Sequence, residues 1–154
     1  MNTQKTIEYL NELVAANADR IEAYRISEKE VKPNDLKILF ASMAETSIIN
    51  KRDLAIHIEL LGGVVNEYKA MAENFFQNWN DFRFAISKND VIFLLKLCNE
   101  GEQLTLNFYE KLLNVQFQFL DENSLQLVKK QYGLLEFDRI STIETLQIIH
   151  HHKN

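Results

Sequence analysis

The chain has 154 residues, of which 46% are hydrophobic and 25% are charged, and its formal net charge is −5. This length lies within the usual size of one domain, so we expect a single domain over residues 1–154 that buries a substantial core. The lysines and arginines are scattered along the sequence, which argues against the basic patch that nucleic-acid binding requires. The single cysteine cannot form a disulfide within the chain and fits a reducing cytoplasm.

The chain contains only four glycines and one proline, so there are few places where long helices could be interrupted. We therefore expect an all-α protein. No segment approaches the roughly 20 apolar residues that a membrane-spanning helix needs, and the first residues lack an apolar signal region. The sequence predicts a cytoplasmic protein that does not enter a membrane.

A first helix is predicted over about residues 3–28, because apolar residues recur there every three or four positions. Asn2 or Thr3 can cap its start. A second helix is predicted over about residues 34–61, with Pro33 placed at its beginning. The connection between the two helices is so short that they must run antiparallel, as a hairpin.

Gly62 and Gly63 are suited to end the second helix. Residues 62–87 differ from the helices before them, because aromatic residues crowd into one short piece of this segment. We predict a long crossover that contains one short helix, packed by its aromatic side chains against the bundle. These residues are Phe75, Phe76, Trp79, Phe82 and Phe84.

A third long helix is predicted over about residues 88–114, opened by a capping box in which Ser87 is the cap and Asp90 is the third helical residue. A fourth is predicted over about residues 122–149, capped by Asp121. Two antiparallel hairpins joined by one long crossover are the connectivity of ferritin-like four-helix bundles.

The third helix carries a carboxylate within an otherwise apolar stripe. A buried carboxylate is costly unless it is paired, hydrogen-bonded or bound to a metal. Glu102 therefore either lies near the solvent-exposed edge of the stripe or has a partner. The stripe is formed by Leu95, Cys98, Glu102, Leu106 or Thr105, Tyr109 and Leu113.

Ferritin-like di-metal sites take a glutamate from each of two helices and a Glu-x-x-His motif from each of the other two. The chain offers one glutamate at comparable depth on each long helix, but Ile48 and Arg139 stand where the two histidines are needed. The candidate metal ligands are Glu22, Glu45, Glu102 and Glu136.

Arg139 follows an apolar line on the fourth helix, which predicts an inward cation on the helix that should pair with the third. We therefore expect Arg139 to replace a metal ligand and to pair with Glu102, with Glu136 or Glu22 beside them. A solvated helix face explains Glu22 and Glu45 equally well. The alternative is a protein that binds iron or manganese through carboxylates and water alone.

Several segments of the chain, among them LKILFASMAE, ELLGG, LCNEGEQLTLNFYEKLL and VKKQYGLLEFDRI, resemble an uncharacterised bacterial family of ferritin-like four-helix-bundle proteins, the domain of unknown function 2383. The resemblance implies a bacterial, self-associating protein linked by analogy to stress response. The family commonly carries a histidine where this chain has Arg139.

Together these features predict a structural or interaction protein, stress-associated and homodimeric, with a degenerate metal site and no resident cofactor, and not an enzyme. A further interpretation is that Phe75, Phe76 and Trp79 line a mouth for a small apolar ligand or a partner protein. The run His150–His152 is given no role.

Overall fold

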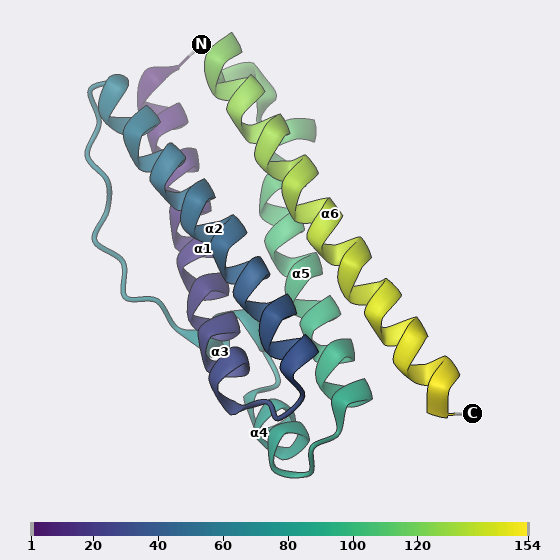
Figure 1. Cartoon of the computed structure of the whole chain (residues 1–154). Coiled ribbons are helices and arrows are strands. Elements are labelled where there is room, and N and C mark those ends of the chain that lie inside the picture. The colour runs from purple at the N-terminus through teal and green to yellow at the C-terminus, as the bar shows by residue number, and fades with distance from the viewer. Residues whose placement is uncertain (1, 154) are drawn as a thin grey trace.

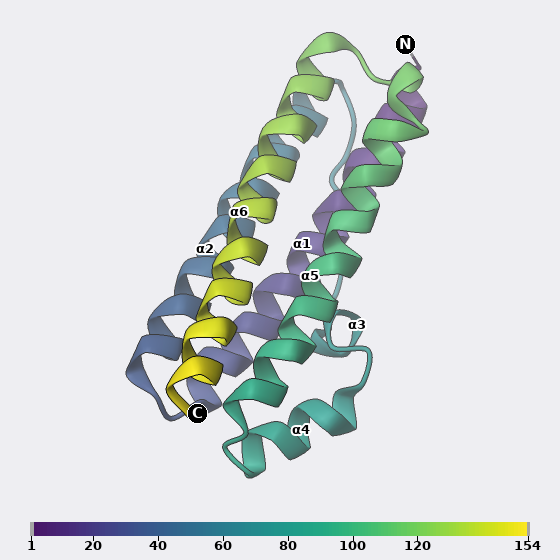
Figure 2. The same ribbon diagram turned by 90° about the vertical axis from the view of Figure 1, so that its right-hand side faces the viewer.

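The computed structural model of the protein describes residues 2–153, with side chains described for residues 2–149. Four long helices run side by side, α1 (Thr3–Glu30), α2 (Asn34–Leu60), α5 (Val91–Asn114) and α6 (Glu122–Lys153) (Figures 1 and 2). Residues 2–153 contain no strand, so the expected all-α class is confirmed. The predicted bounds of the long helices are close to those observed, except at the start of α5.

The helices are arranged as two antiparallel pairs (Figure 1). α1 packs along α2, and α5 packs along α6, and these are the two most extensive contacts between elements. The crossover between the pairs returns along the side of the first pair to the opposite end of the molecule (Figure 1). Both pairs are hairpins, because their connections are short.

The cap at the start of α1 and the glycines at the end of α2 are those that the sequence predicts. The side chain of Asn2 accepts a hydrogen bond from a backbone N–H in the first turn of α1. At the end of α2, the N–H of Gly62 donates to the carbonyl of Glu59, and the N–H of Gly63 donates to the carbonyl of Ile58. This is a Schellman motif, and Gly62 has the left-handed φ of 84° that the motif requires.

The crossover holds two short helices, α3 (Ala72–Phe75) and α4 (Trp79–Ser87), where one was predicted. Consecutive residues of a straight helix point about 100° apart, and the break after Phe75 allows both Phe75 and Phe76 to be buried. Phe82 stacks on Phe76 with ring centroids 4.2 Å apart, so the aromatic packing predicted for this segment is present.

The predicted capping box at the start of α5 is wrong. Ser87 is the last residue of α4, and the cap of α5 is Asp90, whose carboxylate accepts from the N–H of Phe93 at 3.1 Å. Asn89 between them has a left-handed φ of 50°, which separates the two helices. α5 therefore begins three residues later than expected.

Two hydrophobic clusters fill the interior, one toward each end of the long helices. The first contains Phe40, Phe75, Phe76 and Phe82, and the second contains Leu10, Leu54 and Val128. Buried polar residues lie between the two clusters along every long helix. They are Asn17 and Arg20 in α1, Ser47 and Asn50 in α2, Glu102 and Thr105 in α5, and Asp138 and Thr142 in α6.

Candidate functional site

Arg20 lies at the centre of these polar layers and is completely buried. It extends from the middle of α1 toward residues of the other three long helices. Its Nε donates to Glu102 Oε2 at 2.7 Å, and its Nη2 donates to Glu102 Oε1 at 2.6 Å. The pair is therefore bidentate, the geometry that makes arginine–carboxylate interactions strong and directional.

The remaining donors of Arg20 are also satisfied. Nη2 donates to Asp138 Oδ2 at 2.9 Å, while Nη1 donates to the carbonyl of Met43 at 2.7 Å and to Ser47 Oγ at 2.8 Å. A guanidinium has five N–H donors, and here five acceptors surround it. This single side chain thus joins α1, α2, α5 and α6.

The electrostatics of the site favour a charged guanidinium. Burial by itself lowers the pKa of Arg20, but the charge of Glu102 and the hydrogen bonds to it more than offset this, and the pKa rises above its ordinary value. Tyr24 and Asp138 act in the same direction. The cation is therefore fixed in place, and it cannot serve as an acid or base near neutral pH.

Two further titratable groups lie close to this cluster. Burial raises the pKa of the Cys98 thiol, and the nearby charge of Glu102 raises it further. The same two causes raise the pKa of Tyr24, whose ring lies 5.0 Å from Arg20 Cζ. Because the thiol is buried and its pKa is raised, it has little of the thiolate character of a nucleophilic cysteine.

A second polar layer lies beside the first. Tyr109 donates its hydroxyl hydrogen to Gln131 Oε1 at 2.6 Å and accepts from Asn17 Nδ2 at 2.9 Å. Gln131 in turn donates to the carbonyl of Asn50 at 3.0 Å. This layer is neutral, and it again connects all four long helices.

The prediction that Glu102 has a partner within the protein is confirmed, but the predicted partner is wrong. Its partner is Arg20, and Arg139 instead lies 3.9 Å from Glu136 in a partly exposed pair on one helix. The inward line predicted for α6 is confirmed at Val128 and Leu135, but at Leu125, Tyr132 and Arg139 it lies one position after the residue that is buried. The predicted line is Leu125, Val128, Tyr132, Leu135, Arg139, Ile143 or Thr142, and Leu146. The residues that point inward are Ser124, Val128, Gln131, Leu135, Asp138 and Thr142.

The physical reason for this error is that four of those six inward residues are polar. Hydrophobic periodicity places the apolar stripe through flanking residues such as Leu125 and Tyr132 when the true seam carries Ser, Gln, Asp and Thr. Arg20 was missed for the same reason. The sequence did contain a signal that Arg20 points inward. It lies on a line of residues spaced alternately by three and four positions, which is Leu10, Leu13, Asn17, Arg20 and Tyr24.

The four predicted glutamate ligands do not converge. Glu102 is in the interior, whereas Glu45 is exposed. Glu22 lines a depression between α1 and α2 together with Lys51. Glu136 accepts a hydrogen bond from Tyr132 on the flank of α6.

No three His, Cys, Asp or Glu side chains within residues 2–149 form a group suited to hold a metal ion. The side chains of His150, His151 and His152 lie outside the described part of the chain. None of the helices described over residues 2–153 has both the length and the apolar character required to cross a bilayer.

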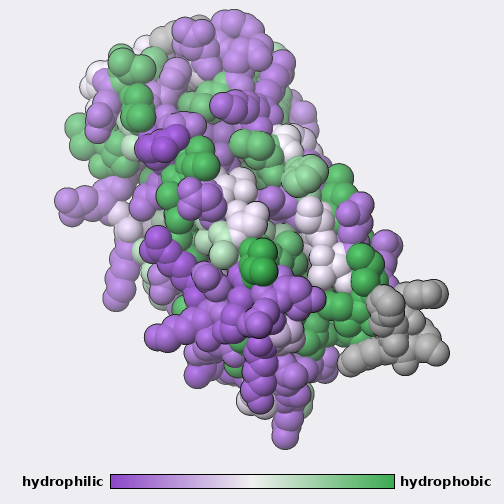
Figure 3. Space-filling model, in the orientation of Figure 1, coloured by the Kyte–Doolittle hydropathy of each residue, from purple (hydrophilic) through white to green (hydrophobic). Residues whose placement is uncertain are grey.

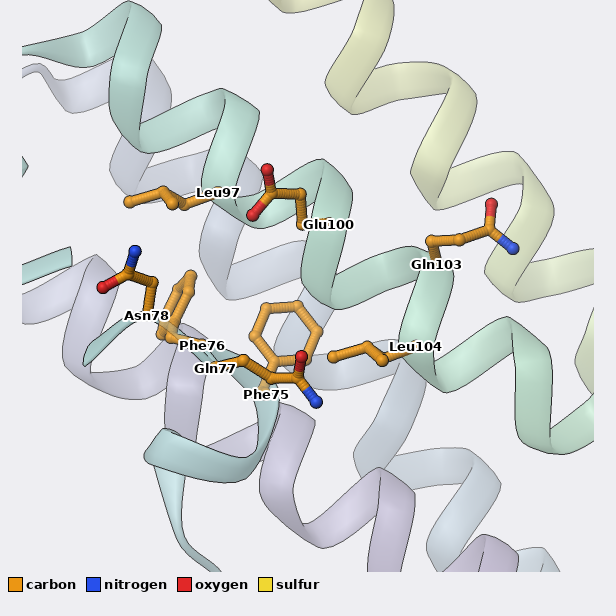
Figure 4. A pocket seen from close by; sticks show the side chains of 8 residues that line it. All are labelled: Phe75, Phe76, Gln77, Asn78, Leu97, Glu100, Gln103 and Leu104. Atoms are coloured by element: carbon orange, nitrogen blue, oxygen red, sulfur yellow. The ribbon is translucent and has the colours of Figure 1, made fainter. Parts of the chain in front are cut away.

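A surface pocket of about 280 Å³ lies where α3 meets the middle of α5 (Figure 4). Phe75 and Phe76 form one wall, Leu97 and Leu104 contribute from α5, and four polar residues complete the lining. Trp79 does not line this pocket but stacks on Phe82 at 5.0 Å. The polar lining residues are Gln77, Asn78, Glu100 and Gln103.

Comparison with known proteins gives a match to one family model. Residues 5–115 match the profile of a family described as Domain of unknown function (DUF2383), which is more than half of the chain. The matched stretch includes Arg20 and Glu102 and ends before α6, which carries Asp138. No curated protein and no solved structure matches the chain.

Proposed function

The chain belongs to the DUF2383 family, and we propose that it is a ferritin-like four-helix bundle in which the guanidinium of Arg20 takes the place of metal ions. In ferritin-like di-metal proteins, carboxylates from the helices point inward to neutralise bound cations. Here Glu102 and Asp138 point inward, and the cation between them belongs to the protein itself.

The observation that carries this proposal is the complete set of partners around Arg20. A metal ion bound by Glu102 would have to displace two charge-assisted hydrogen bonds of 2.6 and 2.7 Å from a buried arginine. The guanidinium would then be left in the interior with unsatisfied donors, which is strongly unfavourable.

It follows that the protein acts through its surface, as a structural or interaction protein, and not through a reaction in its interior. We infer a stress-associated role in the bacterial cytoplasm from the resemblance of its sequence, and a homodimer from the apolar side chains exposed on its long helices. The buried Cys98 is in keeping with a reducing compartment.

Metal analysis tests this proposal. Untagged protein is incubated with Fe(II) without oxygen, or with Mn(II), separated from unbound metal, and analysed for metal content. Less than stoichiometric metal is expected for the wild-type protein and for Glu102→Ala. Stoichiometric metal that is lost in Glu102→Ala but kept in the exposed variant Glu45→Ala would overturn the proposal.

An iron- or manganese-binding protein remains the second candidate, and one observation favours it at Glu136. The hydroxyl of Tyr132 lies 3.0 Å from a carboxylate oxygen of Glu110 and 3.0 Å from one of Glu136. A hydroxyl has one hydrogen to donate, so the two carboxylates share a single donor. Metal that is lost in Glu136→Ala but kept in Glu102→Ala would support this candidate.

The pocket beside α3 supports a third candidate, the binding of a small apolar ligand. Phe76 lines the pocket and stacks on Phe82, which stacks on Trp79, so a ligand there is expected to change the fluorescence of the single tryptophan. The probe is 1-anilinonaphthalene-8-sulfonate, with Leu104→Glu as the variant that blocks the pocket. Unchanged tryptophan emission at saturating probe would count against this candidate.

A further inference from the structure

The outer face of α6 carries large apolar side chains that are exposed to solvent. Leu134, Phe137, Ile140 and Ile148 are 41%, 69%, 50% and 59% exposed, and we call these four residues the outer stripe. Phe137 lies two positions from the buried Leu135, which turns it about 200° away from the interior. Hydrophobic side chains gather along the part of the surface where α6 runs toward the C-terminal end (Figure 3).

The charges beside the outer stripe are placed symmetrically about Phe137. Lys130 lies seven residues before it and Glu144 seven residues after it. Both side chains are exposed, and neither has an opposite charge within 4.0 Å among residues 2–149. Seven residues are two turns, so all three side chains share one face of the helix.

Gly133 lies on this same face, in the interior of a helix where glycine is unfavourable compared with alanine. Apart from its two chain neighbours and the backbone of its own helix, no atom of the described residues lies within 4 Å of the position that a Cβ would occupy there. The fold of one chain therefore gives no reason for the missing side chain. A helix from outside that approaches closely would supply one.

We propose that the outer stripe is the interface with a second copy of this chain, in which two α6 helices pack antiparallel about a two-fold axis at Phe137. In that arrangement Leu134 of one copy faces Ile140 of the other, since they lie three residues either side of the axis. A symmetric interface must be self-complementary, because the same patch serves both partners.

The charged residues and the small residues of this face are also self-complementary when the two helices are aligned about Phe137. Lys130 of each copy faces Glu144 of the other, so two opposite-charge pairs flank the apolar centre. Gly133 faces Ser141, which places the two smallest residues of the face where the helices approach each other. A parallel pair would instead bring like charges together at both positions, which is unfavourable.

This inference deepens the interaction role proposed above by naming the partner. It can fail independently of the interior site, because none of these residues contacts Arg20. Oligomeric state and metal content are separate measurements, so each proposal has its own outcome.

Sedimentation of the full chain from about 1 to 200 µM tests the interface, since this range brackets micromolar dissociation constants. We expect a monomer–dimer equilibrium in the wild-type protein and a monomer throughout for Phe137→Asp. The matched control is Ile38→Asp on α2, where the wild-type side chain is 72% exposed but lies outside the stripe. Circular dichroism confirms that each variant is folded.

Charge exchange tests the register. Lys130→Glu and Glu144→Lys are each expected to weaken the dimer by about tenfold, because each change turns two symmetric attractions into repulsions. The double variant is expected to return to the wild-type affinity. A mixture of the two single variants is expected to form heterodimers, since every facing pair is then of opposite sign.

Three results would overturn the proposal. They are a wild-type protein that is monomeric over the whole range, a dimer that survives Phe137→Asp, and a charge-exchanged double variant that stays as weak as the single ones. Pairing of α6 in parallel, or a dimer formed by a different face, would instead leave the affinity unchanged in all three charge variants.

Discussion

At the scale of single residues, the interior of this protein is organised by hydrogen bonds to one arginine. A buried charge contributes little net stability when it is paired, but it becomes very costly when its partner is removed. Arg20 has two carboxylates, one hydroxyl and one carbonyl as partners, so the effect of each substitution depends on which groups are left unpaired.

The first prediction concerns Arg20→Met. This change leaves Glu102 and Asp138 in the interior without their cation, and we expect the free energy of unfolding to fall by about 3–5 kcal/mol. Urea denaturation measures it. Arg139→Ala serves as the control, because the Arg139–Glu136 pair is partly exposed and should contribute less than about 1 kcal/mol.

A triple variant, Arg20→Met with Glu102→Met and Asp138→Leu, separates charge from packing. Apolar residues of similar volume can replace a buried ionic cluster at little cost, so we expect this variant to recover most of the lost stability. If the triple variant were as unstable as Arg20→Met alone, lost packing would explain the effect, and unpaired carboxylates would not.

The second prediction compares two buried tyrosines. Tyr24 is completely buried, and its hydroxyl has no hydrogen-bond partner among the described residues, whereas the Tyr109 hydroxyl has two. Tyr24→Phe should therefore leave stability unchanged or raise it by about 1 kcal/mol. Tyr109→Phe should lower it by about 1–3 kcal/mol, because Gln131 and Asn17 lose their partner. Equal losses from the two changes would contradict this account.

At the scale of elements, the crossover is attached to the helices by a close contact between α3 and α5. A Cβ built on Gly101 would lie 2.4 Å from Cε1 of Phe75, so only glycine allows this ring to reach the face of α5. The same approach places Phe75 within 5.1 Å of the Tyr24 ring, centroid to centroid. The side chain of Phe75 therefore contacts both α1 and α5.

The third prediction follows from that contact. Gly101→Ala should force Phe75 out of its position and lower the free energy of unfolding by about 1–3 kcal/mol, in spite of the better helix propensity of alanine. Thermal unfolding measures the loss. The matched control is Gly133→Ala in a Phe137→Asp background, where α6 faces solvent and a gain of up to about 1 kcal/mol is expected. A gain from both changes would show that Phe75 moves freely.

At the scale of the whole molecule, the interior contains a thiol and tyrosine hydroxyls that the folded state keeps protonated and therefore neutral. Burial is the first cause in each case, and it raises the pKa of Tyr24, Tyr109 and Cys98 above their ordinary values. The unfolded chain releases these protons near the ordinary values of 9.0 for cysteine and 10.0 for tyrosine, while the folded chain keeps them.

The fourth prediction is a loss of stability in alkali. Between the unfolded and the folded pKa values the folded state binds more protons, so stability falls as the pH rises. The contribution is complete below about pH 8 and declines above about pH 9. Urea denaturation at a series of pH values measures the slope, and the double variant Tyr24→Phe/Cys98→Ala should reduce it. An unchanged slope in that variant would show that other groups control alkaline unfolding.

The sequence by itself determined the parts of this fold that depend on neighbouring residues. Helix formation, capping at Asn2 and the Gly62–Gly63 stop follow from local propensity and hydrogen bonding, and the hairpins follow from short connections. The two options for Glu102, the exposed edge of the stripe or a partner, were also evident, because a carboxylate buried without a partner is costly in any fold. The later start of α5 was not evident, since Ser87 and Asp90 are both good caps and only packing selects between them.

Only the tertiary structure decided which residues meet. The partner of Glu102 lies 82 positions away on α1, and the true inward face of α6 carries Gln131, Asp138 and Thr142 where a hydrophobic stripe would be expected. Hydrophobic periodicity reads the inner face of a helix from its apolar residues, so it fails where polar residues occupy the seam and are satisfied by other helices. The rotation of each helix about its axis is fixed by those long-range hydrogen bonds, and no single stretch of sequence contains them.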